Sequence, residues 1–226
     1  MCAVIKVFTV GGDLDVDRAF ALQSTCFGDE KEWFEAFLAA ANGQQYIACC
    51  IGEEYVGGLF LLDMTLGTHT GKYVYALGVH PAHRGKGIAK SLLETAKTLS
   101  EDFTLICAAD EKLAATYAKY GFDRDIAGTV PRGAARGVQM DISAYTMRCT
   151  YREVCGLKLS ERLFAFALEE CGASLYTDGS RVIASAKSGV YAAYGCPAKV
   201  AQKAQMYVKK NIDTSSIHAD LILEVE

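Results

Sequence analysis

The sequence predicts a mixed α/β fold, an α+β arrangement on a mixed sheet, in a chain of 226 residues. Segments rich in β-branched and aromatic residues alternate with segments whose apolar residues recur every three or four positions. The apolar period changes from strand-like to helical after Pro81. A content of 51% hydrophobic and 22% charged residues is typical of a globular chain with a sizeable core.

The first 80 residues are predicted to form one strand, two helices and then three strands in succession. Strand-forming runs and helical spacing define these elements, and Gly28 and Pro81 end two of them. The expected strands are Ala3–Thr9, Gln45–Ile51, Tyr55–Asp63 and Lys72–His80, and the expected helices are Asp15–Phe27 and a segment around Trp33, Phe34, Phe37 and Leu38.

A helix, a buried strand and a second helix are expected after Pro81. The first helix has one apolar face between Ile88 and Leu99, and Phe103–Ala108 is a continuous apolar run suited to a strand buried on both faces. The second helix contains Leu113 and Tyr117 and ends at Gly121. This unit is expected to occupy residues 1–148.

Residues 149–226 are predicted to form a small α+β module or an extension of the first sheet. Helices are expected at Ser160–Cys171 and Pro197–Lys210, and a strand at Ala219–Val225. The dipeptide Asp178–Gly179 between two short apolar runs is typical of a β-hairpin.

Composition disfavours several classes of function. The nine cysteines contain no C-x-x-C pair and no zinc-site spacing with the four histidines, so buried thiols are expected and no metal. A net charge of −4 without a basic run predicts no nucleic-acid partner. No apolar run reaches the roughly 20 residues of a membrane span. No membrane partner is therefore expected. Because acidic residues follow early, at Asp13 and Asp15, no signal peptide is expected either, and a cytoplasmic location is predicted.

The most informative segment is the glycine-rich turn Arg84-Gly85-Lys86-Gly87-Ile88-Ala89, where a strand ends and a helix begins. Gly85 and Gly87 permit positive φ and close backbone approach. Free N–H groups at a helix start favour an anion, and two cations flank the turn. A pyrophosphate meets these requirements.

Two other phosphate-binding motifs fail on specific residues. In the P-loop pattern, Ala89 stands where the glycine before Lys90 belongs, and Arg84 replaces the first glycine. In the dinucleotide pattern G-x-G-x-x-G, Lys90 occupies the last glycine position. A glycine turn without a ligand remains the structural alternative.

The sequence resembles the GNAT superfamily of acetyl-CoA-dependent N-acetyltransferases. The family's R/Q-x-x-G-x-G/A signature matches Arg84 to Ala89, preceded by Val79-His80-Pro81. A second block, Y-x-x-x-G-F, matches Tyr117 to Phe122. The predicted element order also agrees with the GNAT core, so the resemblance covers residues 3–148.

The resemblance implies a role for each matching residue. The backbone amides of Arg84, Gly85, Lys86, Gly87, Ile88 and Ala89 would hold the CoA pyrophosphate, and Leu77, Gly78 and Val79 would pair with the pantetheine arm. A main-chain N–H would stabilise the oxyanion. Tyr117 would protonate the departing thiolate, since thiol and phenol pKa values of about 8.5 and 10 lie close together. The alternative for Tyr117 is a core tyrosine at helical spacing.

Two positions depart from the family pattern. Asp110 stands seven residues before Tyr117, where an asparagine often binds the pantetheine, and is expected to accept from the pantetheine amide or to cap the helix. The strands Tyr73–Leu77 and Phe103–Cys107 have no carboxylate that acts as a general base. Tyr75, an ordered water, or Glu53 and Glu54 are the candidates for that role.

The acceptor is expected to be a primary amine of a small molecule or peptide, with acetyl-CoA as co-substrate and no metal. Aromatic residues of the first two helices either line its groove or pack on the sheet, and packing is favoured. Alternatives are a longer acyl-CoA, a non-catalytic acyl-CoA sensor on a degenerate GNAT scaffold, and a nucleotide-binding switch. The C-terminal segment would cover the acceptor or mediate a homodimer.

Overall fold

The computed structural model of the chain divides into two compact units. The first consists of Met1–Asp63, Thr70–Asp123 and Gln205–Asn211, and the second of Met64–His69, Arg124–Ala204 and Ile212–Glu226. The described residues are 3–131, 138–141, 143, 156–170, 172, 174–177, 182–186, 189–194, 198–209, 212 and 218–219.

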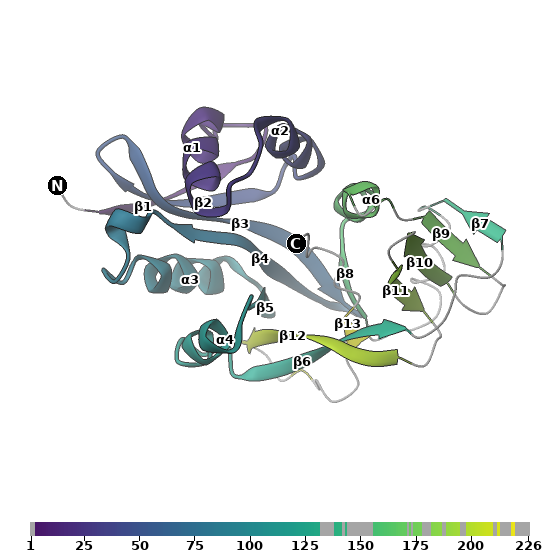
Figure 1. The fold of residues 1–226 in the computed structure, drawn as a ribbon. Helices are drawn as coiled ribbons and strands as arrows, with labels where there is room; N and C mark the ends of the chain where they lie inside the picture. Colours follow the sequence, from purple (N-terminus) through teal and green to yellow (C-terminus); the bar gives the residue numbers. More distant parts are fainter. Residues whose placement is uncertain are drawn as a thin grey trace. The chain divides into compact units, whose positions relative to one another are not determined.

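The predicted order of strand, two helices, three strands, helix, strand and helix is confirmed in the first unit (Figure 1). The strands are β1 (Val4–Thr9), β2 (Gln45–Ile51), β3 (Glu54–Leu66), β4 (His69–Val79) and β5 (Phe103–Cys107). The helices are α1 (Val16–Phe27), α2 (Lys31–Ala40), α3 (Ile88–Leu99) and α4 (Glu111–Ala118), with the 3-10 turn η1 at Pro81–His83. The mixed α/β fold class is confirmed.

Local signals set the ends of α1. The Asp15 carboxylate accepts a hydrogen bond from the Arg18 N–H at 3.1 Å, so Asp15 caps the helix and does not lie within it. At the other end Gly28 has φ 80° and donates to the Ser24 carbonyl at 2.9 Å. The left-handed conformation that glycine tolerates therefore ends the helix where the sequence predicted.

The sheet of the first unit is antiparallel at one side and parallel at the other. The strands follow the order β1-β2-β3-β4-β5, in which β1 and β2 run antiparallel from Val4↔Cys50 to Thr9↔Gln45. In contrast, β4 and β5 run parallel. A parallel neighbour requires a crossover connection, and α3 supplies it.

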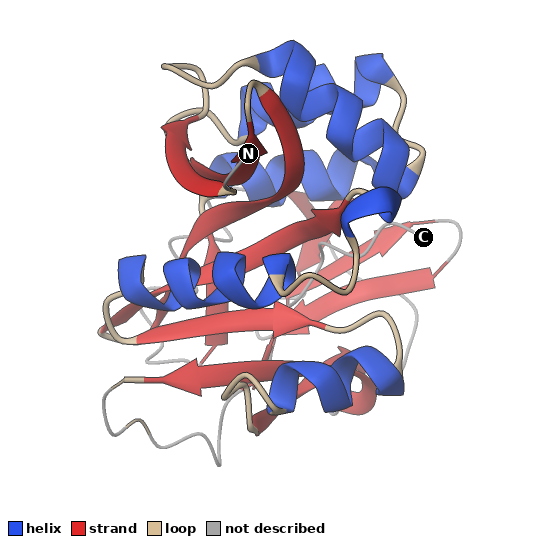
Figure 2. Ribbon diagram, turned by 90° about the vertical axis from the view of Figure 1, so that its left-hand side faces the viewer, coloured by secondary structure: helices blue, strands red, loops and turns tan. Residues whose placement is uncertain are grey.

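Helices cover both faces of this sheet (Figures 1 and 2). Under α1 and α2 the core is aromatic. The rings of Phe37 and Tyr46 each meet the Phe60 ring edge-on, with distances between ring centroids of 4.8 and 4.7 Å. Such pairs contribute roughly 0.5–1.5 kcal/mol beyond their buried area. The face under α3 and α4 is mainly aliphatic and includes Ile47, Leu59, Leu61, Val74, Leu92, Leu93 and Ile106.

The helix expected over Pro197–Lys210 is wrong, because Ala198–Val208 forms the strand β12. β12 lies beside β5 in the strand order. Gln205 Nε2 donates to the carbonyls of Ala114 and Phe122 at 3.0 and 3.1 Å. The backbone groups of β5 need pairing partners. Helix propensity differs by only about 0–0.7 kcal/mol per ordinary residue, which does not outweigh that pairing.

The second unit contains a separate antiparallel sheet with the order β11-β10-β9-β7. The expected helix is present as α6, and the expected hairpin strands pair from Val182↔Thr177 to Ser185↔Ser174, whereas Asp178–Gly179 lies outside the described residues. Of Ala219–Val225, Ala219 is a strand residue and the rest also lies outside them. The elements are β6 (Arg124–Pro131), β7 (Val138–Met140), β8 (Gly156–Leu159), α6 (Glu161–Glu170), β9 (Ser174–Thr177), β10 (Val182–Ala186), β11 (Gly189–Tyr194) and β13 (His218–Ala219).

Candidate functional site

β4 continues past its last pair with β5, and this end of the strand pair is called the opening. Their pairing runs from Gly71↔Phe103 to Val74↔Ile106, whereas β4 continues to Val79. Just beyond the last pair, Ala76 has φ 51°. Among the residues that the structure describes, Ala76 alone has positive φ without being glycine. A residue in this conformation bends a strand out of its ladder, as in a β-bulge. The bend at Ala76 therefore follows directly on the end of the pairing with β5.

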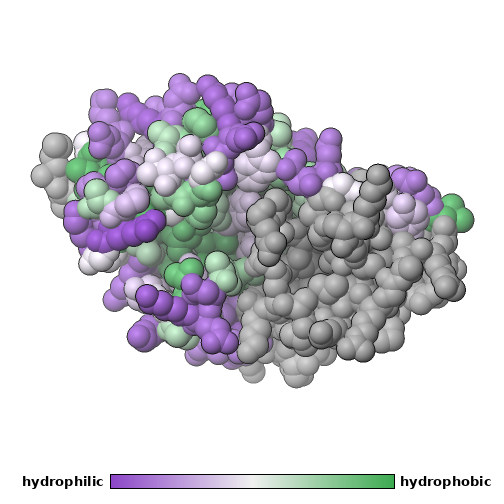
Figure 3. Space-filling view, in the orientation of Figure 1, coloured by the Kyte–Doolittle hydropathy of each residue, from purple (hydrophilic) through white to green (hydrophobic). Residues whose placement is uncertain are grey.

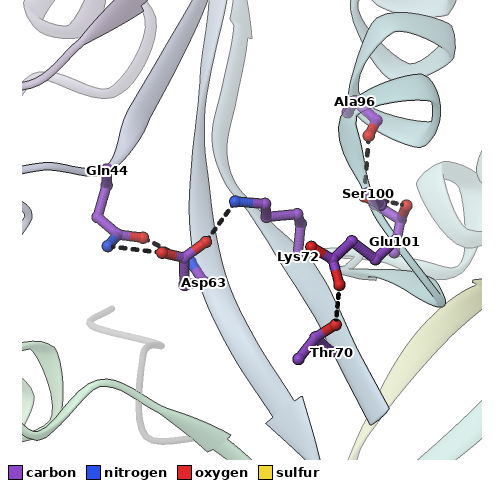
Figure 4. A network of polar contacts seen from close by, with 8 residues as sticks. Gln44, Asp63, Thr70, Lys72, Ala96, Ser100 and Glu101 are labelled. Carbon is purple, nitrogen blue, oxygen red and sulfur yellow. Dashed lines mark hydrogen bonds and ion pairs between the residues drawn. The ribbon is translucent and has the colours of Figure 1, made fainter.

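The opposite ends of the same strands are held together by polar contacts (Figure 4). Lys72 of β4 forms an ion pair with Asp63 of β3, whose carboxylate also accepts from Gln44 Nε2 at 3.2 Å. Thr70 donates its hydroxyl to Glu101, and its carbonyl accepts from the Asp102 N–H at 2.9 Å. These contacts tie the start of β4 to β3 and to the segment that precedes β5.

The glycine-rich turn has the conformation that the sequence predicted. Gly85 and Gly87 have φ +75° and +77°, and apart from the adjoining residues of the chain no protein atom lies within 4 Å of the position that a Cβ would occupy on either residue. Gly87 is the N-cap of α3 and supplies no side-chain cap to the first N–H groups. The helix therefore begins with main-chain donors that a bound anion can satisfy.

The cations of the turn stabilise it from within. Arg84 Nε donates to the Val79 carbonyl and Lys86 Nζ to the Ala82 carbonyl, each at 3.1 Å. His80 Nδ1 accepts from the Ala82 N–H at 3.3 Å. These contacts fix the loop while both positive charges remain at the turn, where they favour an anion.

The start of α3 is anchored in the core beside β3. Ile88 is only 6% exposed, and its Cγ2 atom lies 2.6 Å from the position that a Cβ would occupy on Gly57. A side chain at Gly57 would displace this contact, so the glycine permits the close approach. The structure thus leaves the backbone of Ile88, but not its side chain, for ligand contact.

Tyr117 lies in α4 at the aliphatic core that includes Val74, Ile88 and Ile106. Its side chain is 8% exposed, and burial, with a smaller effect of the Asp110 charge, raises its pKa to about 12. The phenol therefore keeps its proton at neutral pH. The sequence predicted that the pKa of Tyr117 would lie close to a thiol pKa of about 8.5. In the structure the two pKa values lie further apart, because burial penalises the phenolate.

The raised pKa of Tyr117 predicts a specific loss of stability in alkali. Below about pH 10, the usual phenol pKa, folded and unfolded chains both hold this proton. Between pH 10 and the folded value of about 12 only the folded chain holds it, so stability falls as pH rises. We expect wild type to lose about 1.4 kcal/mol relative to Tyr117→Phe between pH 8 and pH 11. Urea unfolding of both proteins measures this, and parallel pH profiles would contradict it.

Asp110 performs the capping role that the sequence left open. Its Oδ1 accepts from the Leu113 N–H at 2.6 Å, and its carbonyl accepts from the Ala114 N–H at 3.0 Å. Asp110 is thus the N-cap of α4. Its predicted contact with the pantetheine amide stays a prediction.

The candidate bases lie in two different places. Tyr75 adjoins Ala76 at the opening, and its ring packs 5.1 Å from that of Phe37. Glu53 instead binds Arg18 at 3.2 Å, beside a separate surface cavity of about 450 Å³. That cavity is lined by Arg18, Ala21, Leu22, Thr25, Glu53, Glu54, Tyr55 and His80. Tyr75 is therefore the candidate that adjoins the opening.

Sequence reasoning missed two polar residues on the α1 side of the sheet. Gln23 is 1% exposed, and its Nε2 donates to the Ala76 carbonyl at 3.4 Å. The sequence pattern that could have revealed Gln23 is a polar residue on the buried face of α1, four residues after Ala19. Asp29 follows α1, and burial raises the pKa of its carboxyl. Two residues before it, the Phe27 ring lies 3.1 Å from a Cβ built on Gly78.

The aromatic residues of α1 and α2 mostly pack, as the sequence favoured. Phe34 and Phe37 are 1% and 0% exposed, and Trp33 stacks on Phe37 at 5.6 Å. Phe27 differs, since it is 49% exposed. Figure 3 shows apolar residues gathered on one face of the first unit between hydrophilic margins.

The described part of the chain offers no metal site and no membrane-spanning helix. Within this part, no group of three or more His, Cys, Asp and Glu residues is placed to hold a metal ion. Cys26, Cys49, Cys50 and Cys107 have free thiols, and two of them are buried. No described helix is both long and apolar enough to cross a membrane.

Fold and turn together define an α/β domain in which a helix without a side-chain cap begins at a glycine-rich turn, after a strand that outlasts its pairing with a parallel neighbour. Residues 33–124 match the family model of the acetyltransferase (GNAT) domain. The chain therefore contains a GNAT acetyltransferase domain, which confirms the resemblance found in the sequence. A comparison with curated protein sequences gives no match.

Solved structures share the fold at low sequence identity. A proposed acetyltransferase from Pyrococcus horikoshii has TM-score 0.60 and 14% identity, with 96% of this chain and 95% of that chain covered. A GCN5-related N-acetyltransferase from Kribbella flavida has TM-score 0.55 and 13% identity, with 84% and 56% covered. A conserved protein from Enterococcus faecalis V583 has TM-score 0.54 and 13% identity, with 85% and 54% covered. The chain thus spans little more than half of the last two.

Proposed function

We propose that this protein transfers the acetyl group of acetyl-CoA to a primary amine of a small molecule or peptide. One observation carries the proposal: β4 continues to Val79 beyond its last pair with β5 and leads directly into a glycine-rich turn in which a Cβ on either glycine would meet no atom other than those of its chain neighbours. An extended arm that ends in a pyrophosphate matches this sequence of strand edge and anion site.

The residues present fit CoA along its length. The amides of Gly85 to Ala89 would bind the pyrophosphate, since side chains are absent from Gly85 and Gly87 and the first N–H groups of α3 have no cap. Leu77, Gly78 and Val79 would pair with the pantetheine as one strand pairs with another. The thioester would then lie near Ala76, at the start of the opening.

The chemistry follows direct attack in a ternary complex. The amine nitrogen attacks the thioester carbonyl carbon, a main-chain N–H of β4 stabilises the oxyanion, and the carbon–sulfur bond breaks. Tyr117 would give its proton to the departing thiolate. The proton lost by the amine would leave through water beside Tyr75, which adjoins the opening.

Ligand preference tests the donor site. Acetyl-CoA at 100 times its Kd is expected to stabilise the folded chain by about 2.7 kcal/mol, which raises Tm by roughly 5–10 °C for a chain of this size. ATP at equal concentration should raise Tm by less, because the P-loop glycines are missing. Thermal unfolding with each ligand measures this. A larger shift with ATP would favour a nucleotide-binding protein instead.

The absence of a carboxylate on the described strands β4 and β5 favours one second function, an acyl-CoA sensor without turnover. An acceptor screen separates the two by following CoA thiol release with amines, polyamines, aminoglycosides and peptides. Release with any acceptor supports acetyl transfer. No release despite measured acetyl-CoA binding supports the sensor.

A further inference from the structure

The bulge in β4 is held at an unfavourable backbone angle. Ala76 has φ 51°, a left-handed conformation that costs a residue with a Cβ roughly 1–2 kcal/mol. Such a conformation persists only where neighbouring groups hold it. The contact that meets Ala76 from α1 is therefore informative.

That contact comes from a buried glutamine. Gln23 is 1% exposed, and its Nε2 donates to the Ala76 carbonyl at 3.4 Å. A peptide unit is planar and trans, so the Ala76 carbonyl and the Leu77 N–H point in opposite directions. A carbonyl held toward α1 therefore directs the Leu77 N–H away from α1.

A second buried group, the Tyr46 hydroxyl, lies close enough to the glutamine for Gln23 to oppose the rise that burial causes in the pKa of this hydroxyl. Gln23 Oε1 and the Tyr46 hydroxyl are both buried, and neither has a hydrogen-bond partner among the described residues. One of them accepts and the other can donate, so a small shift that pairs them satisfies both. Tyr46 reaches this layer because Gly58 lacks a side chain, where a Cβ would lie 2.1 Å from the hydroxyl oxygen.

We propose that Gln23 is a positioning residue which, oriented by Tyr46, holds the Ala76 carbonyl and so directs the Leu77 N–H to the thioester oxygen. This inference rests on the proposed acetyl transfer. It assigns Gln23 and Tyr46 an effect on the rate of transfer and little effect on CoA binding, because neither touches the glycine-rich turn.

The test compares isosteric variants. Gln23→Met is expected to lower kcat at least about tenfold. Complete removal of one oxyanion donor costs roughly 100- to 1,000-fold, and this variant misplaces the donor without removing it. KM for acetyl-CoA should stay within about threefold. Tyr46→Phe should lower kcat in the same direction by a smaller factor. Thr104→Val is the matched control, because it removes a buried 2.7 Å hydrogen bond from Thr104 of β5 to Ser100, the C-cap of α3, but should keep kcat within about twofold.

A rescue separates positioning from general loss of structure. Glycine adopts positive φ without strain, so Ala76→Gly in the Gln23→Met background should restore most of the lost kcat. Wild-type kcat in Gln23→Met, or an equal loss in Thr104→Val, would overturn the proposal.

A structural readout keeps the inference independent of turnover. If wild type transfers no acetyl group, the proposed function fails, and a crystal structure of Gln23→Met still decides whether the glutamine holds the bulge. An Ala76 φ that leaves the positive region supports the clamp. An unchanged positive φ at Ala76 rejects it.

Discussion

Replacing both Gly85 and Gly87 by alanine is expected to lower the affinity for acetyl-CoA about 100-fold, or about 2.7 kcal/mol. Their φ angles of +75° and +77° disfavour a residue with a Cβ. New methyl groups would also project into the space over the turn, which no residue other than the chain neighbours of each glycine enters within 4 Å. Hydrogen bonds to a charged group contribute roughly 1.5–3 kcal/mol each, so the loss of one or two of them accounts for the factor. Calorimetric titration measures it.

The chain offers a matched control for this substitution. Gly43 has φ +84° and likewise no protein atom within 4 Å of a Cβ position, but it follows α2 and lies outside the turn. Gly43→Ala should therefore lower stability by about 1–2 kcal/mol, as each single alanine in the turn should, and leave acetyl-CoA affinity unchanged. Equal losses of affinity in both variants would mean that strain, and not the anion site, explains the result.

The sequence predicted the first unit well because its signals are local. Gly28 ended α1, the change of period after Pro81 placed the start of α3, and Gly85 and Gly87 adopted the positive φ angles that the motif requires. Each of these depends on the conformational freedom of a few neighbouring residues. Local chemistry can therefore be identified without knowledge of the tertiary structure.

What the sequence did not predict depends on contacts between distant segments. Ala and Gln in β12 favour a helix, and only its position beside β5 makes it a strand. Alanine gave no sign of the bulge, because Ala76 takes positive φ in a setting that includes Gln23, 53 residues away. The pKa of Tyr117 likewise depends on burial by elements that meet only in the fold.

Tyr117→Phe is expected to lower kcat about 100-fold and to change acetyl-CoA affinity by less than about threefold. A general acid contributes roughly 100- to 10,000-fold. We place Tyr117 at the lower end, because a phenol with a pKa of about 12 gives up its proton less readily than an ordinary one. Steady-state kinetics with saturating acceptor, together with calorimetric titration of acetyl-CoA, separates the two effects.

Tyr120→Phe is the matched control. Tyr120 lies three residues after Tyr117, just beyond the end of α4, and its backbone N–H donates to the Tyr117 carbonyl at 2.9 Å. Its kcat should stay within about twofold of wild type. Loss in Tyr117→Phe alone assigns the proton to that one phenol. If both variants keep wild-type kcat, another group protonates the thiolate. If neither variant nor wild type releases CoA while all three bind acetyl-CoA, the buried phenol is part of the core and the domain is a sensor.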